Sequence, residues 1–126
     1  MDNKNFLKLN DIEAYRIVFK LSNHVWDLIL KWDYFAKDTV GKQFVRAVDS
    51  ISANRAEGFG RYSKKDKIKF FGYSTGSLYE YLDWNEKSHV RNLLNEEEYS
   101  EIFSELIKLP KAINSLILFT NNKLQI

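Results

Sequence analysis

The chain contains no cysteine, which excludes a disulfide framework, a thiolate metal site and a cysteine nucleophile. It has two histidines, His24 and His89, and their positions lack the spacing of metal ligands. The sequence also offers no recognisable nucleophile–base pair. We therefore expect a protein without enzymatic activity, cofactor or metal.

Helix-breaking residues and long apolar runs are also scarce. One proline and five glycines leave long stretches uninterrupted, which favours helices over a turn-rich β fold. No run approaches the roughly 20 apolar residues of a membrane span, and residues 1–11 form no apolar leader segment. We expect a cytoplasmic protein that does not bind membranes.

The residues that are present have globular proportions. The chain has 126 residues, of which 44% are apolar and 29% charged, and this fits a single domain spanning 1–126. Aromatic residues make up 15%, which indicates a bulky core and apolar surface left over for a partner.

Residues 10–32 show the periodicity of a helix with two apolar stripes. Asn10 suits an N-cap, and Glu13 follows three residues later as in a capping box. Two adjacent stripes predict a face that contacts two neighbouring helices. One stripe comprises Ile12, Tyr15, Phe19, Ser22, Trp26 and Ile29, and the other Ala14, Val18, Leu21, Val25, Leu28 and Trp32.

A second helix is predicted over residues 39–58, and a third from Ser63 to about residue 91. Gly58 and Gly60 suit the end of the second helix, because glycine tolerates the left-handed conformation of a C-cap. Ser63 can cap the third helix, and Asp66 is favourably placed near its positive end.

A fourth helix is predicted to begin at Asn95, which can cap the glutamate run that follows. Pro110 lies inside its apolar pattern and predicts either a kink or a break into two helices near Leu109. The connections around 33–38, 59–62 and 92–94 are short, so neighbouring helices should run antiparallel. The expected fold is all-α, an antiparallel up-down-up-down four-helix bundle.

The segment GFGRYS, residues 58–63, superficially resembles a phosphate-binding loop. It lacks the third glycine of a dinucleotide-binding fingerprint and the Gly-Lys-Ser/Thr end of a P-loop, and a helix precedes it where a strand would be needed. We interpret it as a helix cap and a turn. The start of the third helix could still bind an isolated phosphate through its backbone donors.

A basic cluster follows these glycines. Five cations and one carboxylate, Asp66, give residues 61–69 a net charge of +4, while the whole chain carries +2. Such a tip could neutralise phosphates of RNA or DNA without sequence preference, and a tyrosine could stack on a base. The candidate contacts are Arg61, Tyr62, Lys64, Lys65, Lys67 and Lys69. The alternative is a solvated turn, since exposed lysines are common.

A hairpin that turns near residue 61 sets the second helix against the third. Arg46 then lies opposite Gly76 and could pair with Glu80. Gly72 and Gly76 would let the two helices approach closely. Glu57 would bond groups near the turn, far from Glu80, which argues against a hydrolase-like carboxylate pair. The predicted polar and small seam comprises Arg46, Ser50, Asn54, Glu57, Gly58, Gly72, Gly76, Ser77 and Glu80.

Two further features indicate self-association. Aromatic residues off the main stripe of the third helix are candidates for a subunit interface: Phe70, Tyr73, Tyr81 and Trp84. Glutamates gather in the C-terminal half, at Glu96, Glu97, Glu98, Glu101 and Glu105. A basic tip and an acidic opposite end could favour ring-like or head-to-tail assembly.

Residues 46–80, RAVDSISANRAEGFGRYSKKDKIKFFGYSTGSLYE, resemble the signature of the four-helix bundle family that includes the 23S rRNA intervening-sequence proteins. The shared segments are R-A-x-x-S-I-x-x-N-x-A-E-G, then G-x-x-R, then G-S-L-x-E. They fall on Arg46, Ala47, Ser50, Ile51, Asn54, Ala56, Glu57, Gly58, Arg61, Ser63, Gly76, Ser77, Leu78 and Glu80. Arg55 stands where the family usually has isoleucine, and Thr75 where an arginine is common.

The resemblance implies a bacterial protein that forms a homopentameric ring and has no established enzymatic activity. A similar bundle serves as the accessory protein of diversity-generating retroelements, which works with reverse transcriptase and nucleic acid. By analogy we expect a non-enzymatic oligomer that binds nucleic acid weakly and without sequence preference. The alternative is a structural or adaptor module that binds a protein partner through apolar ring surfaces.

Overall fold

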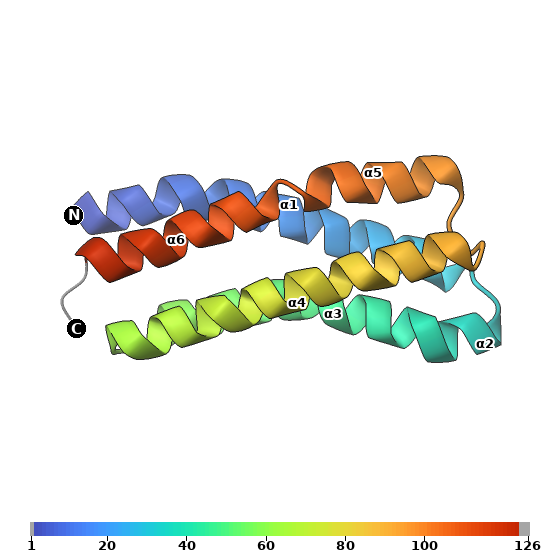
Figure 1. Cartoon of the computed structure of the whole chain (residues 1–126), viewed down its shortest axis with the longest axis horizontal. Helices are drawn as coiled ribbons and strands as arrows, with labels where there is room; N and C mark the ends of the chain where they lie inside the picture. Colours follow the sequence, from blue (N-terminus) through green and yellow to red (C-terminus); the bar gives the residue numbers. More distant parts are fainter. Residues whose placement is uncertain (1, 124–126) are drawn as a thin grey trace.

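Four helical legs lie side by side in the computed structural model, which describes the backbone of residues 2–123 and the side chains of residues 13–122. The legs are α1 (Asp2–Leu30); α2 (Tyr34–Ala36), η1 (Lys37–Gly41) and α3 (Lys42–Gly60); α4 (Lys64–Val90); and α5 (Glu96–Leu106) with α6 (Leu109–Lys123). Successive legs run in opposite directions (Figure 1). The prediction of an all-α four-helix bundle is confirmed.

Each leg packs against two neighbours around a common core. α3 contacts α1 and α4, and α6 contacts the same two helices from the other side. α1 and α4 therefore occupy opposite corners of the bundle. Within the described residues, no helix is both long and apolar enough to cross a membrane.

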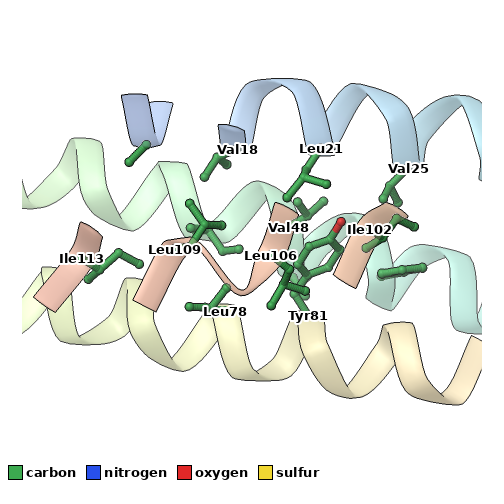
Figure 2. Close-up of a cluster of buried hydrophobic side chains, with 14 of the residues drawn as sticks. Val18, Leu21, Val25, Val48, Leu78, Tyr81, Ile102, Leu106, Leu109 and Ile113 are labelled. Atoms are coloured by element: carbon green, nitrogen blue, oxygen red, sulfur yellow. The ribbon is translucent and has the colours of Figure 1, made fainter. Parts of the chain in front are cut away.

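One apolar stripe of α1 lies in the core, as expected. Val18, Leu21 and Val25 are buried, and Figure 2 shows them pointing toward Leu106 and Ile102 of α5 and the other buried side chains. Full burial of an aliphatic side chain of this size contributes about 1.5–3 kcal/mol. This stripe therefore holds α1 in the bundle.

The other predicted stripe of α1 is mostly uncovered. Tyr15, Phe19 and Trp26 are 52%, 56% and 53% exposed, whereas Ile29 is buried. The side chain of Ile12 lies outside the described residues. α1 does contact two neighbouring legs, as its two stripes predicted. The second stripe nevertheless lies at the edge of these contacts and leaves its aromatic side chains half exposed, because a helix at one corner of a bundle turns only one face to the centre.

Two legs begin earlier than predicted. α1 begins at Asp2, so Asn10 lies inside the helix and the predicted N-cap there is wrong. The second leg begins after Asp33, whose side chain accepts a hydrogen bond from the Ala36 backbone at 2.9 Å. Residues 34–38, predicted as a connection, are therefore helical.

A π-helical turn, η1, joins α2 to α3 and interrupts the apolar periodicity of the second leg near its start. It widens one turn, so that the consecutive residues Val40 and Gly41 are both buried. A Cβ on Gly41 would lie 2.8 Å from Ile29 Cγ2, so glycine lets α1 approach at this point. The widened turn shifts the phase of the apolar pattern, which explains why the sequence predicted a start near residue 39.

The helix caps of α4 and α5 match the prediction. Ser63 Oγ accepts a hydrogen bond from Asp66 N at 3.1 Å. Asn95 Oδ1 accepts one from Glu98 N at 2.7 Å, and Glu98 Oε1 accepts one from Asn95 N at 2.9 Å. These bonds satisfy backbone donors that have no partner inside their helices.

The fourth leg is broken rather than kinked. α5 ends at Leu106 and α6 begins at Leu109, which places Pro110 in the first turn of α6. Proline is tolerated there because the first amide groups of a helix have no intrahelical acceptor. Of the two alternatives, the break near Leu109 is confirmed.

α3 and α4 form the most extensive helix contact, in a register that differs from the predicted one. Ser74 Oγ donates to the Ile51 carbonyl at 2.7 Å, and Asn54 Nδ2 donates to Ser77 Oγ at 3.4 Å. The contact is therefore specified by two serines on α4 and not by its glycines.

Gly72 and Gly76 face away from the bundle. A Cβ on either would meet no atom within 4 Å, so the predicted close approach of α3 at these glycines is wrong. Arg46 and Glu80 are both exposed, and the ion pairs among described residues do not join them. The predicted Arg46–Glu80 pair within the chain is therefore also wrong. Ser50 is half-buried beside this contact.

Gly58 is buried inside α3 instead of capping it. The C-cap is Arg61, in an extended conformation, and no described glycine has a positive φ, so the predicted left-handed glycine cap is wrong. A Cβ on Gly58 would lie 2.5 Å from Phe71 Cε1. This glycine therefore lets α3 and α4 meet near the turn.

Tyr81 lies in the core, although the sequence placed it at a subunit interface. It is completely buried, with its ring 5.2 Å from the Phe44 ring, and Figure 2 shows it below Leu106. Burial raises the pKa of Tyr81 far above its ordinary value. Its hydroxyl has no hydrogen-bond partner among the described residues. The interface prediction for Tyr81 is wrong.

We expect Gly58→Ala to lower the free energy of unfolding by about 1–2 kcal/mol, because overpacking against Phe71 outweighs the gain in helix propensity. Gly60→Ala is the matched control, since a Cβ on Gly60 meets nothing within 4 Å. Urea unfolding followed by circular dichroism measures both. Equal stabilities of the two variants would contradict the packing role of Gly58.

We expect Tyr81→Phe to raise the free energy of unfolding by about 1 kcal/mol at neutral pH, because it removes an unpaired buried hydroxyl. The raised pKa means that the unfolded chain loses this proton first. Wild-type stability should therefore fall as the pH rises above about 10, and the variant should lose less. Chemical unfolding of both proteins below and above pH 10 tests this prediction. If the free energies of unfolding of wild type and variant fell equally with pH, the prediction would be contradicted.

Candidate nucleic-acid interface

The basic cluster lies at the end of the bundle where α3 turns into α4. Residues 61–63 form the whole turn, and α1 begins and α6 ends at the same end (Figure 1). Because the turn is short, the six predicted contact residues share this end, which we call the basic tip. It comprises Arg61, Tyr62, Lys64, Lys65, Lys67 and Lys69.

Arg61 is held against the bundle. Its Nη2 lies 2.6 Å from Glu57 Oε2, one turn earlier in the chain. Its guanidinium carbon lies 4.4 Å from the centre of the Phe70 ring, which meets Tyr73 edge-on. An ion pair this exposed contributes little stability, but its carboxylate offsets one positive charge of the tip.

Two lysines of the basic tip bind helix ends. Lys67 Nζ donates to the Phe59 carbonyl at 3.0 Å, and Lys64 Nζ donates to the Asn121 carbonyl at 3.3 Å. Both carbonyls lie in the last turns of helices, where acceptors lack intrahelical donors and the helix dipole favours a cation. These lysines therefore serve the fold as well as the charge of the tip.

Tyr62, Lys65 and Lys69 form the open part of the basic tip. Tyr62 is 80% exposed, and both lysines are exposed and form no ion pair with another described residue. Proteins that bind single-stranded nucleic acid combine exposed aromatic rings, on which bases stack, with cations that neutralise the backbone. The arrangement offers few fixed donors, so it selects for negative charge and not for sequence.

Within the described residues, no group of three or more histidines, aspartates and glutamates could hold a metal. His24 Nε2 lies 3.1 Å from Glu101 Oε1, and His89 Nε2 lies 2.9 Å from Glu96 Oε1. Each pair joins α5 to a neighbouring helix.

A polar cluster that the sequence did not predict lies at the α4–α5 turn. The His89 ring stacks on Tyr99 at 4.1 Å, and Tyr99 donates a short hydrogen bond to Glu86. This hydrogen bond to a carboxylate raises the pKa of Tyr99. Tyr99 is separated from both partners by a turn of the chain, so no local pattern indicates the cluster. It fixes α5 against α4.

The remaining aromatic residues predicted for an interface are only partly available. Tyr73 is exposed, while Phe70 is half-buried under Arg61. Trp84 is half-buried against the core and lines a surface hollow of about 680 Å³ beside Phe35. The larger exposed aromatic surface is on α1, along the stripe for which the sequence predicted contact with a neighbouring helix.

We expect Lys67→Ala to lower the free energy of unfolding by about 0.5–1 kcal/mol, because the Phe59 carbonyl loses its donor. Lys65→Ala, in the same helical turn, should leave it within about 0.5 kcal/mol of wild type. Thermal unfolding of the two variants under identical conditions tests this. A larger loss for Lys65→Ala would contradict the capping role.

The comparisons with known proteins agree with this architecture. A search of curated proteins finds no match. A family model described as 23S rRNA-intervening sequence protein matches residues 10–115, which include the basic tip and part or all of each of the four legs. The match covers most of the chain, and it includes the signature segments in α3 and α4. The chain therefore belongs to the 23S rRNA-intervening sequence protein family.

Proposed function

We propose that the protein is a bacterial, cytoplasmic, non-enzymatic accessory factor that self-associates and binds RNA or DNA weakly through its basic tip. The observation that carries the proposal is the joint exposure of Tyr62, Lys65 and Lys69 at a tip with local net charge +4. Such a surface releases counterions from a nucleic-acid backbone without reading its bases.

The proposed binding by one subunit is weak because much of the charge is already engaged. Arg61 is paired with Glu57, and Lys64 and Lys67 bind backbone carbonyls. Phosphates would compete with these partners. Several tips on one assembly, five in the ring that we favour, would raise the apparent affinity through effective concentration.

A second candidate function is an adaptor that binds a protein partner through apolar surface. The observation that favours it is the exposed aromatic side of α1, where Trp26 and Leu30 line a hollow of about 440 Å³ with Val45 of α3. Contiguous apolar patches on a protein surface commonly mark interaction sites, whereas single exposed apolar residues do not. The same surface also suits self-association.

We expect Tyr62→Ala/Lys65→Glu to weaken binding of short single-stranded RNA and DNA about tenfold or more at low salt, because stacking and phosphate contacts are both lost. It should also lower the slope of log K against log salt by about one. Fluorescence anisotropy across a salt series measures both quantities.

The control is Tyr34→Ala/Lys31→Glu, which removes an equally exposed tyrosine and an exposed lysine at the other end of the bundle. It should bind as wild type does. If the wild type fails to bind at low salt, or if the two double variants bind equally, the nucleic-acid proposal is wrong.

A further inference from the structure

A line of apolar side chains runs along the outside of α1 without a partner in the chain. Tyr15, Phe19, Trp26 and Leu30 are each more than half exposed, and we call them the α1 seam. Spacings of four, seven and four residues keep them on one face of the helix. The seam follows the groove between α1 and α3.

Two hollows indent this groove and leave room for side chains of another helix. The first, of about 370 Å³, is lined by Tyr15 and Val18 of α1 and by Ser52, Arg55, Ala56 and Phe59 of α3. The second, of about 440 Å³, lies farther along, between Trp26 and Val45. The groove is therefore indented at two levels along the seam.

The outer face of α4 lacks a side chain at two positions. Gly72 and Gly76 lie one turn apart in the helix interior, where glycine weakens a helix. A Cβ at either position would meet nothing within 4 Å, so no contact within the described chain requires glycine. We call the face around them the α4 glycine face. Bare backbone on a helix surface lets another element approach closely.

The seam and the glycine face lie at the same height along the bundle. The Ile51–Ser74 hydrogen bond and the Gly58–Phe71 contact set residues 52–56 of α3 beside residues 72–76 of α4. The first hollow sets Tyr15 beside that same part of α3. α1 and α4 run in the same direction (Figure 1), so Phe19 lies one turn beyond Tyr15 just as Gly76 lies one turn beyond Gly72.

Charges at the far ends of the two faces are complementary. Lys42 and Arg46 border the seam at Trp26 and Leu30, whereas Glu80 and Asp83 border the glycine face. Lys42 and Asp83 are already paired within their own helices, to Asp38 and Lys87.

That leaves Arg46 and Glu80, which are exposed and have no ion-pair partner among the described residues. The α3–α4 register puts them close to the same height, because Arg46 lies less than two turns before Ile51 and Glu80 less than two turns after Ser74. If a second copy lies beside the first without axial shift, Glu80 of one copy comes close to Arg46 of the other.

We infer that the α1 seam of one copy packs on the α4 glycine face of a second copy, with Arg46 of the first facing Glu80 of the second. The two faces belong to opposite corners of the bundle, so the contact is head-to-tail and repeats from copy to copy. With the bundle axes parallel and no axial rise, such a contact closes into a ring when the rotation from one copy to the next divides a full turn. This inference rests on the proposed self-association and names its surfaces.

The first test is the mass in solution by light scattering at micromolar concentration for wild type, Gly76→Leu and Gly60→Leu. Both glycines have open space for a side chain, so both variants should fold with at least wild-type thermal stability. The wild type and Gly60→Leu should form the same oligomer, and Gly76→Leu should dissociate to monomer. An unchanged oligomer for Gly76→Leu would overturn the interface while leaving self-association intact.

The second test exchanges the charges. Arg46→Glu and Glu80→Arg should each weaken the oligomer at least tenfold at low salt, and the double variant should recover most of the loss. Arg91→Glu, an exposed arginine outside both faces, should have no effect. Failure of the double variant to recover would overturn the pairing. A wild-type monomer would overturn self-association itself, and a two-fold dimer would overturn the head-to-tail arrangement.

Discussion

The structure depends on a limit of four-helix packing: each leg can turn only one face toward the shared core. α1 carries two apolar stripes, and the core accepts the one that contains Val18, Leu21 and Val25. The other stripe remains outside with its aromatic rings half exposed. Apolar surface left outside a core in this way is costly in water, so the same constraint that determines the bundle also produces the exposed apolar surface on which the proposed self-association depends.

The basic tip shows how folding and binding can share residues. Cations stabilise the free carbonyl groups at the C-terminal end of a helix. Lys64 does so for α6, and Lys67 does so for α3. The charge of the tip is therefore explained in part by the fold. The exposed remainder, Tyr62 with Lys65 and Lys69, has no such explanation, and for this reason the functional proposal rests on these three residues.

The sequence predicted the features that are governed by local interactions. Ser63 and Asn95 each bond to an amide three residues away, so their caps could be inferred without knowing the fold. The role of Gly58 was predicted wrongly, because glycine is required there by the close contact with Phe71 across the turn. Register, the buried position of Tyr81 and the Tyr99 cluster depend likewise on residues distant in sequence. The charges of the tip could be predicted, but the backbone acceptors of its lysines could not.

The break between α5 and α6 divides the fourth leg into two units. The helical hydrogen-bond ladder changes at Lys108, whose amide donates to the Glu105 carbonyl three residues back, and Pro110 has no amide proton with which to continue it. Fraying that begins at the C-terminal end of α6 can therefore stop at Leu109 without unwinding α5, which the Asn95 capping box and the Tyr99 contacts hold separately. The leg can thus behave as two foldons that open independently of each other. Because Lys64 donates to Asn121, the basic tip is fastened to α6 and shares the local opening of that unit alone.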